Sequence, residues 1–111
     1  MKFGDILREL LEQNSMSQKE FAQILNITPA ALGNYIHNTR EPDYKILLRI
    51  AEYFNVSTDY LLGKSDIRKP DAEIKQEFEF AYHKEAEGLT DEEIADAIRF
   101  YKQIKYGKKE N

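Results

Sequence analysis

The fold is decided by the stretch Ser17-Gln18-Lys19-Glu20-Phe21-Ala22-Gln23-Ile24-Leu25-Asn26-Ile27-Thr28-Pro29-Ala30-Ala31-Leu32-Gly33-Asn34-Tyr35-Ile36-His37-Asn38-Thr39-Arg40-Glu41-Pro42. It holds two short helical patterns with only a brief turn between them. Two short helices joined this tightly form a helix-turn-helix, a motif whose second helix enters the major groove of DNA. The stretch therefore predicts a nucleic-acid-binding module.

Each helix of this pair carries its own boundary signals. Ser17 and Glu20 form a capping box at the start of the first helix. Thr28 is the expected N-cap of the second helix, and Pro29 takes its first position, where a missing N–H costs nothing. Asn26 tolerates the left-handed conformation that ends a helix. We therefore expect two separate helices rather than one long one.

Three further helical patterns surround the pair. Apolar residues recur at helical spacing over residues 4–13, Asp43 is expected to cap a helix that Asn55 ends, and Ser57 caps a short helix that Gly63 ends. No segment alternates with period two, so we predict an all-α fold. The side chains expected in its core are Phe3, Ile6, Leu7, Leu10, Leu11, Phe21, Ala22, Leu25, Leu32, Ile36, Leu47, Ile50, Ala51, Phe54, Leu61 and Leu62.

Composition limits the classes of function. The 111 residues carry 16 basic and 20 acidic side chains, and residues 1–69 hold nine of each sign, so the net charge of −4 lies in the remainder. A near-neutral domain can bind DNA only by gathering a few positive groups on one face. The absence of cysteine excludes disulfides and thiolate metal sites and fits the cytoplasm. No apolar run is long enough to cross a membrane.

No signature of catalysis is present. The only histidines, His37 and His83, are far apart in the sequence, and no glycine-rich loop could cradle a phosphate. We therefore expect neither an enzyme nor a cofactor.

Residues 3–63 resemble the phage-repressor-like (Xre and Cro type) helix-turn-helix domain, a resemblance that covers a little over half of the chain. It implies a five-helix domain that binds an inverted-repeat operator as a dimer and regulates transcription. The matching features are Ser17-Gln18-x-x-Phe21-Ala22, Asn26-Ile27-Thr28, Tyr35, Arg40-x-Pro42, Leu47-x-x-Ile50-Ala51 and Val56-Ser57-x-x-Tyr60-Leu61-Leu62-Gly63.

Two departures from the family pattern carry information. The family often pairs an arginine near the end of its first helix with a glutamate near the end of its third, and these positions are Leu11 and Ile36 here. Such a replacement of an ion pair by apolar side chains can be neutral or stabilising, and we expect the two to meet in the core. Gly33 costs its helix about 1 kcal/mol, and would allow the DNA to approach closely.

The resemblance assigns base contacts to Thr28, Pro29, Ala30, Gly33 and Asn34. Only Asn34 can make a bidentate contact, most naturally to adenine, whereas Pro29 and Ala30 can contact only thymine methyl groups. With so few polar groups, specificity would depend on A·T-rich sites and on DNA shape. The alternative is that the alanines and Gly33 merely fill the helix.

Phosphate contacts are expected at the start of the first helix of the pair and at the end of the second, from Gln18, Lys19, Tyr35, Asn38, Thr39 and Arg40, with Lys45 as a further candidate. Each has an alternative. Gln18 could serve only as a cap and Tyr35 as a half-buried core residue. For the two lysines we favour solvated surface charges, and for Gln18 and Arg40 the phosphate contact.

The rest of the chain is predicted as a DNA-binding domain over 1–64 joined by a linker, 65–70, to a helical tail, 71–111. A helix is expected from Asp71 to Glu87, with Ile74, Phe78, Ala81 and Tyr82 on one stripe and Gly88 at its end. A second capping box at Thr90 starts a final helix that reaches about Tyr106.

The apolar face of this final helix is wide, and comprises Ile94, Ala97, Ile98, Phe100, Tyr101 and Ile104. We favour self-association into a homodimer through this face, because repressor operators require dimers. The alternatives are that the helix folds back onto the first and fifth helices, or that it docks an antirepressor or other regulatory protein. A different class of function also stays open, namely an antitoxin or an adaptor whose tail binds a partner protein.

Overall fold

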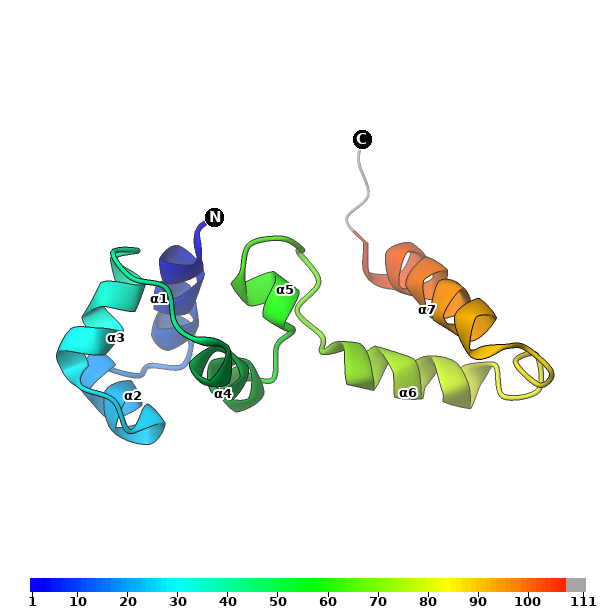
Figure 1. Cartoon of the computed structure of the whole chain (residues 1–111), viewed down its shortest axis with the longest axis horizontal. Helices are drawn as coiled ribbons and strands as arrows, with labels where there is room; N and C mark the ends of the chain where they lie inside the picture. Colours follow the sequence, from blue (N-terminus) through cyan, green and yellow to red (C-terminus); the bar gives the residue numbers. More distant parts are fainter. Residues whose placement is uncertain (108–111) are drawn as a thin grey trace.

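The computed structural model describes residues 1–107 and is built of helices joined by short turns (Figure 1). Residues 108–111, the end of the predicted tail, lie outside the described residues. Within residues 1–107 no strand occurs, which confirms the all-α prediction. The helices are α1 (Phe3–Gln13), α2 (Gln18–Leu25), α3 (Pro29–Ile36), α4 (Tyr44–Phe54), α5 (Thr58–Leu61), α6 (Asp71–Ala81) and α7 (Asp91–Tyr106).

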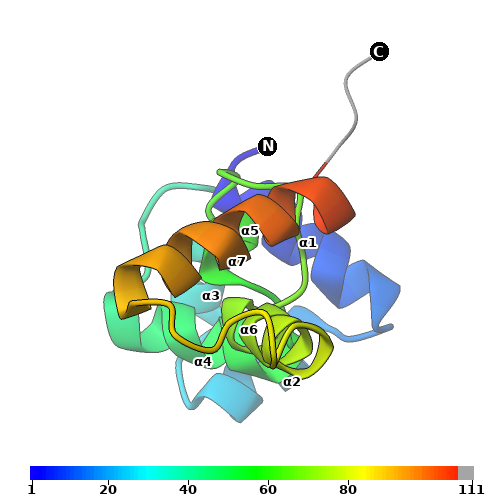
Figure 2. The same cartoon turned by 90° about the vertical axis from the view of Figure 1, so that its right-hand side faces the viewer.

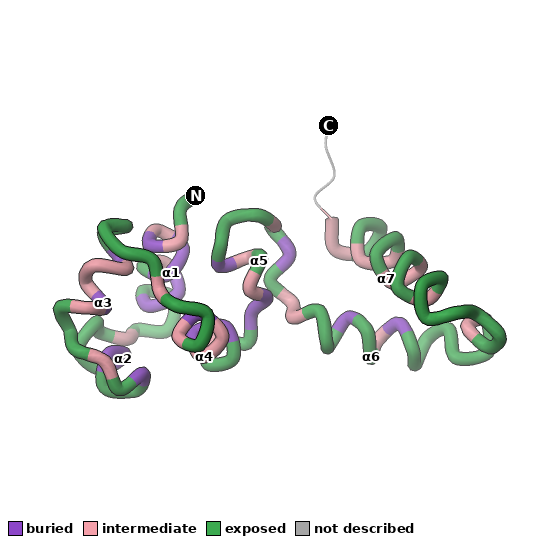
Figure 3. Tube along the Cα trace, viewed as in Figure 1, coloured by how far each residue is buried: buried purple, intermediate pink, exposed green. Residues whose placement is uncertain are grey.

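The first five helices enclose one hydrophobic core, in which α3 packs against both α1 and α2. Figure 3 shows the buried positions of these helices in purple. Leu62 was expected inside but is 40% exposed, because α5 ends at Leu61 and Gly63 turns the chain away with φ +75°. The buried apolar side chains of this core are Ile6, Leu7, Leu10, Leu11, Phe21, Ala22, Leu25, Leu32, Ile36, Leu47, Ile50, Ala51, Val56 and Leu61.

The helix boundaries follow the expected capping residues. The side chains of Ser17, Thr28, Asp43 and Ser57 each accept a hydrogen bond from a backbone N–H one turn into the following helix. Asn26 and Asn55 end α2 and α4 in the left-handed conformation, with φ 57° and 54°. The capping box predicted at Thr90 is formed. The one predicted at Ser17 is only half formed, because the Glu20 carboxylate bonds to the Ser17 hydroxyl and not to the Ser17 backbone N–H. Local signals of this kind fix where the helices begin and end.

Residues 65–70, the predicted linker, are fastened to the domain. The Ser57 backbone N–H donates to the Arg68 carbonyl at 2.7 Å, and the Ser57 hydroxyl donates to the Ile67 carbonyl at 2.9 Å. Ile67 is 6% exposed, and the Arg68 guanidinium lies 5.0 Å from the centre of the Tyr60 ring. These contacts hold the start of the tail against α5.

The tail is a hairpin of two helices that extends the molecule to 51 × 34 × 23 Å. Its helices lie in front of the five-helix domain when the molecule is viewed along its length (Figure 2). α6 ends at Ala81 and not at Glu87 as predicted, and the side chains of residues 79–85 are exposed. The helix against which α7 packs is α6, so the expected alternative of folding back onto the first and fifth helices is not what the structure adopts.

Candidate nucleic-acid interface

The turn between α2 and α3 is tightly hydrogen-bonded. The N–H groups of Asn26 and Ile27 bond to the carbonyls of Gln23 and Ala22 at 3.1 and 3.0 Å, which closes the end of α2. The Thr28 hydroxyl oxygen then accepts the Ala31 N–H at 3.1 Å and starts α3. Backbone and cap together therefore fix the direction in which α3 leaves the turn.

Arg49 of α4 completes this turn, a role that sequence reasoning missed. Its guanidinium donates to the Leu25 carbonyl at 2.6 Å and to the Ile24 carbonyl at 3.0 Å. A helix end leaves its last carbonyls unpaired and carries negative partial charge, so a cation that binds them is favourable. The sequence feature that could have suggested this role is the position of Arg49 directly before Ile50, on the buried stripe of α4.

The C-terminal end of α3 is held against the N-terminal end of α1. The Gly4 N–H donates to the Asn38 side-chain oxygen at 2.8 Å. A Cβ at Gly4 would lie 2.2 Å from the Ile36 carbonyl oxygen and 2.6 Å from that of Tyr35, so only glycine permits this approach. Asn38 has φ +61°, a conformation that asparagine tolerates. Sequence reasoning did not single out Gly4, because nothing near it in the chain indicates the contact.

The residues predicted to contact bases lie together on α3. Thr28, Pro29 and Ala30 are exposed, and Gly33 and Asn34 are half-exposed one turn later, while Leu32 and Ile36 face the core. A Cβ at Gly33 would meet no protein atom within 4 Å, so packing inside the chain does not require this glycine. α3 therefore presents a narrow surface of small side chains with one amide.

The residues predicted to contact phosphate fall into two groups. Gln18 and Lys19 are exposed at the start of α2, and Asn38, Thr39 and Arg40 are exposed after α3. Within residues 1–107 neither Lys19 nor Arg40 takes part in an ion pair. Three of the six predicted residues also make contacts inside the domain: Tyr35 packs against the core, the Asn38 side-chain oxygen accepts from the Gly4 N–H, and the Thr39 hydroxyl contacts Asn34.

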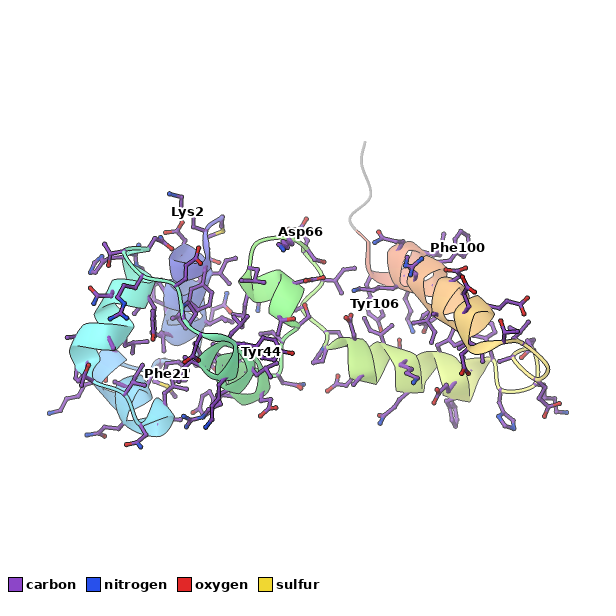
Figure 4. The ribbon with its side chains drawn as sticks, in the orientation of Figure 1. Lys2, Phe21, Tyr44, Asp66, Phe100 and Tyr106 are labelled. Atoms are coloured by element: carbon purple, nitrogen blue, oxygen red, sulfur yellow. The ribbon has the colours of Figure 1, made fainter. Side chains whose placement is uncertain are left out.

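The apolar face of α7 is divided between α6 and solvent. Ile94, Ala97, Ile98 and Tyr101 are half-buried, whereas Phe100 and Ile104 are 70% and 67% exposed. Figure 4 labels Phe100 on the side of α7 away from α6, and Tyr106 on the side toward it. A shallow groove of about 240 Å³ runs beside the two exposed residues, lined by Phe78, Tyr82, Ala97, Phe100, Tyr101 and Ile104.

A polar cluster around Glu77 of α6 holds α7 in place. The hydroxyls of Tyr106 and Tyr101 donate to the Glu77 carboxylate at 2.6 and 2.9 Å, and the Lys69 ammonium donates to it at 3.2 Å. The bonds from Tyr106 and then Tyr101 lower the pKa of Glu77 from its ordinary value of 4.5 to about 2. The pKa of Lys69 is raised by its bonds to Tyr106 and Glu77, so the cluster keeps its charges.

Other kinds of site find no support in the part of the chain that is described. Among residues 1–107 no three His, Cys, Asp or Glu side chains gather where they could hold a metal ion. None of the described helices is both long and apolar enough to pass through a membrane.

Known proteins share both the sequence and the fold. A helix-turn-helix family model matches residues 7–61. The HTH-type transcriptional regulator ImmR of Bacillus subtilis is 44% identical over 69 residues, which are 62% of this chain and 54% of ImmR. The uncharacterized HTH-type transcriptional regulator YobD of the same organism is 31% identical over 97 residues, which are 84% of this chain and 86% of YobD.

A solved structure, that of a transcriptional regulator from Listeria innocua, has a similar fold. It has a TM-score of 0.57 and 24% identity, and the match covers 96% of this chain and 97% of that one. The matches to ImmR and to YqaE, a further Bacillus subtilis regulator, span 54% and 56% of those proteins, about half of their length. With the helix-turn-helix geometry, these matches show that the chain belongs to the Xre-type helix-turn-helix family of transcriptional regulators, which are DNA-binding proteins and not enzymes.

Proposed function

We propose that this protein represses transcription by binding an inverted-repeat operator in double-stranded DNA as a homodimer. The observation that supports this most is the outward side of α3, where Thr28, Ala30 and Asn34 lie together while Leu32 and Ile36 anchor the helix in the core. A helix fixed on one side and open on the other is suited to lie in a major groove. We therefore also expect a cytoplasmic location.

Asn34 would carry most of the direct base reading. Its amide can accept from N6 and donate to N7 of adenine, whereas Pro29 and Ala30 can contact only thymine methyl groups. The open space around Gly33 would let a base or the DNA backbone approach α3 closely. Sequence preference beyond these contacts would come from the shape of A·T-rich DNA.

Phosphate contacts would set the position of α3 in the groove. Arg40 is an exposed cation after α3, and Gln18 is an exposed amide donor at the start of α2, where the exposed Lys19 is a further candidate. Because residues 1–69 are neutral overall, these few groups must supply the electrostatic part of the affinity.

Two substitutions separate base reading from phosphate binding. Asn34→Ala should cost about 1–3 kcal/mol and relax base preference at one position of each half-site. Arg40→Ala should weaken binding to all sequences alike and reduce the salt slope by about one. Lys75→Ala, which removes an equal charge from the exposed surface of α6, is the control. The measurement is affinity for a duplex selected from a random pool, at several salt concentrations.

The phosphate assignment fails if Arg40→Ala leaves affinity for non-specific DNA unchanged. The base assignment fails if Asn34→Ala keeps the full base preference. A chain that binds no DNA at any salt concentration would instead be an adaptor, and one that co-purifies with a tight protein partner would be an antitoxin.

The homodimer would form through α7. Phe100 and Ile104 are one turn apart and exposed, so they form a continuous apolar strip. The acidic residues of α7 lie in its first half and the basic residues in its second half. Antiparallel pairing of two copies about a two-fold axis would bring apolar strip against apolar strip and opposite charges together. Pairing would also hold the two copies of α3 about 34 Å apart, so that each could enter one of two successive major grooves on the same face of the DNA.

Sedimentation of the full chain tests this interface. Phe100→Ser combined with Ile104→Ser should convert a dimer to a monomer at micromolar concentration and lower operator affinity while keeping base preference. Phe80→Ser is the matched control, since Phe80 is 91% exposed but lies on α6. A full chain that is already monomeric would indicate a tail reserved for an antirepressor or other protein. A double variant that stays dimeric would place the interface elsewhere.

A further inference from the structure

The Thr39 hydroxyl lies next to the amide that would read the DNA. Its oxygen is 3.2 Å from the Asn34 side-chain oxygen and 3.1 Å from the Asn34 backbone carbonyl oxygen. Thr39 itself is exposed in the segment that follows α3. A hydroxyl has a single proton to donate, so it matters which of the two oxygens receives it.

The backbone oxygen of Asn34 already has enough donors. It accepts the Thr39 N–H at 2.9 Å and the Arg40 N–H at 3.3 Å. A carbonyl oxygen has two lone pairs, and these two N–H groups occupy both. The proton of the Thr39 hydroxyl is therefore best placed on the side-chain oxygen of Asn34. A phosphate contact that required the same proton would have to break this bond.

A hydrogen bond to Oδ1 decides how the amide faces outward. The last torsion of asparagine is broad and roughly two-fold, so a free side chain can exchange the places of its oxygen and nitrogen. With one lone pair of Oδ1 bound to Thr39, the second lone pair and the Nδ2 donors remain for a base. Acceptor and donor are then presented in one fixed order, which is what bidentate reading of adenine requires.

We propose that Thr39 is a specificity-determining positioning residue, which orients the Asn34 amide for base reading and does not bind phosphate. This inference rests on the proposed base contact of Asn34. Thr39 acts through Asn34, so its contribution exists only while the asparagine is present.

The experiment uses the full chain and five proteins: unaltered, Asn34→Ala, Thr39→Val, Thr39→Ser, and Asn34→Ala with Thr39→Val. The probes are the duplex that the unaltered chain selects from a random pool, the three versions altered at the base pair most sensitive to Asn34→Ala, and one unrelated duplex. Valine keeps the branched shape of threonine without the hydroxyl, and serine keeps the hydroxyl. Thermal melting of each variant checks that the domain stays folded.

Thr39→Val should lower the preference for the favoured base pair by about 2- to 12-fold, the range of one neutral hydrogen bond. Affinity for the unrelated duplex and the salt slope should stay as in the unaltered chain. Thr39→Ser should keep the base preference. In the Asn34→Ala background, Thr39→Val should add no further loss, because residues that act as one unit are non-additive.

Three results would overturn the proposal for Thr39. These are full base preference in Thr39→Val, an equal loss on all five duplexes with a shallower salt slope, and a loss that adds to that of Asn34→Ala. The second of these would restore Thr39 as a phosphate contact. If Asn34→Ala alone leaves base preference intact, the proposed base contact of Asn34 fails first, and the role of Thr39 fails with it.

Discussion

Leu11 and Ile36 are closed off from solvent, with 4% and 1% of their surfaces exposed. Both belong to the core shared by α1 and α3, at positions where the family often carries an ion pair. A buried charge without its partner is strongly destabilising, whereas a complete buried pair can be close to neutral. The two positions therefore allow a test that compares one introduced charge with a complete introduced pair.

We predict that Leu11→Arg alone lowers the free energy of unfolding by about 3–5 kcal/mol. Adding Ile36→Glu should recover part of that loss, because the new carboxylate would pair with the guanidinium. Urea unfolding of the two variants and of Ile36→Glu alone gives the coupling energy. A double variant no more stable than Leu11→Arg would show that the two positions do not meet.

Single residues also show which structural features can be predicted from the sequence. Ser17, Thr28, Asp43 and Ser57 could be assigned as caps because each bonds to an N–H only a few residues away. Asn38 instead binds Gly4, 34 positions away in the sequence, and the packing of α1 on α3 brings the two together. The local pattern thus predicted the helices, while the contacts that hold helix ends together stayed hidden.

At the scale of the helices, α4 contributes a side chain to the turn between α2 and α3. Arg49 binds the two carbonyls at the end of α2 that the turn leaves open. The same bonds direct its guanidinium toward the end of α2. α4 thereby supports the turn that leads into α3.

Arg49→Met should lower the free energy of unfolding by about 1.5–3 kcal/mol, since it leaves those carbonyls without their charged donor. Arg49→Lys should recover only part, because an ammonium lacks the forked pair of donors. Lys45→Met, on the exposed side of α4, is the control and should change stability little. Equal effects of the Met variants in urea unfolding would contradict this role for Arg49.

The tail helices show the limit of periodicity. The capping box at Thr90 and the end near Tyr106 were correct for α7, and its apolar stripe was correct in spacing. Spacing alone could not divide that stripe between α6 and solvent, because the division depends on how the hairpin closes. Periodicity also placed the end of α6 too late, at Glu87, whereas the helix ends at Ala81.

At the scale of the whole molecule, the tail is joined through Glu77. This carboxylate receives both tyrosine hydroxyls of α7 and the Lys69 ammonium from the segment that leaves the domain. Lys102 adds an ion pair to Asp71 at 2.7 Å. Residues 65–70, α6 and α7 are therefore joined at the Glu77 carboxylate.

Acid should loosen the hairpin through this group. Because the pKa of Glu77 is lowered from 4.5 to about 2 in the folded tail, its stabilising effect is complete above pH 4.5 and is lost as the pH falls toward 2. The carboxyl carbon of Glu77 should titrate in NMR spectra with a midpoint near 2. Replacing Tyr101 and Tyr106 with phenylalanine should raise that midpoint toward 4.5, and an unchanged midpoint would rule out the tyrosines as its cause.

The bonds from Ser57 to residues 67 and 68 have a consequence for the choice of DNA site. They fasten the start of the tail to the domain. In two chains paired through their tails, the distance between the two DNA-binding domains would therefore be fixed. Each base pair inserted between half-sites turns the second one by about a tenth of a helical turn as well as moving it away. A flexible linker between domain and tail would accommodate that rotation and displacement of the second half-site. This protein would instead select operators by the spacing of their half-sites as strictly as by their base sequence.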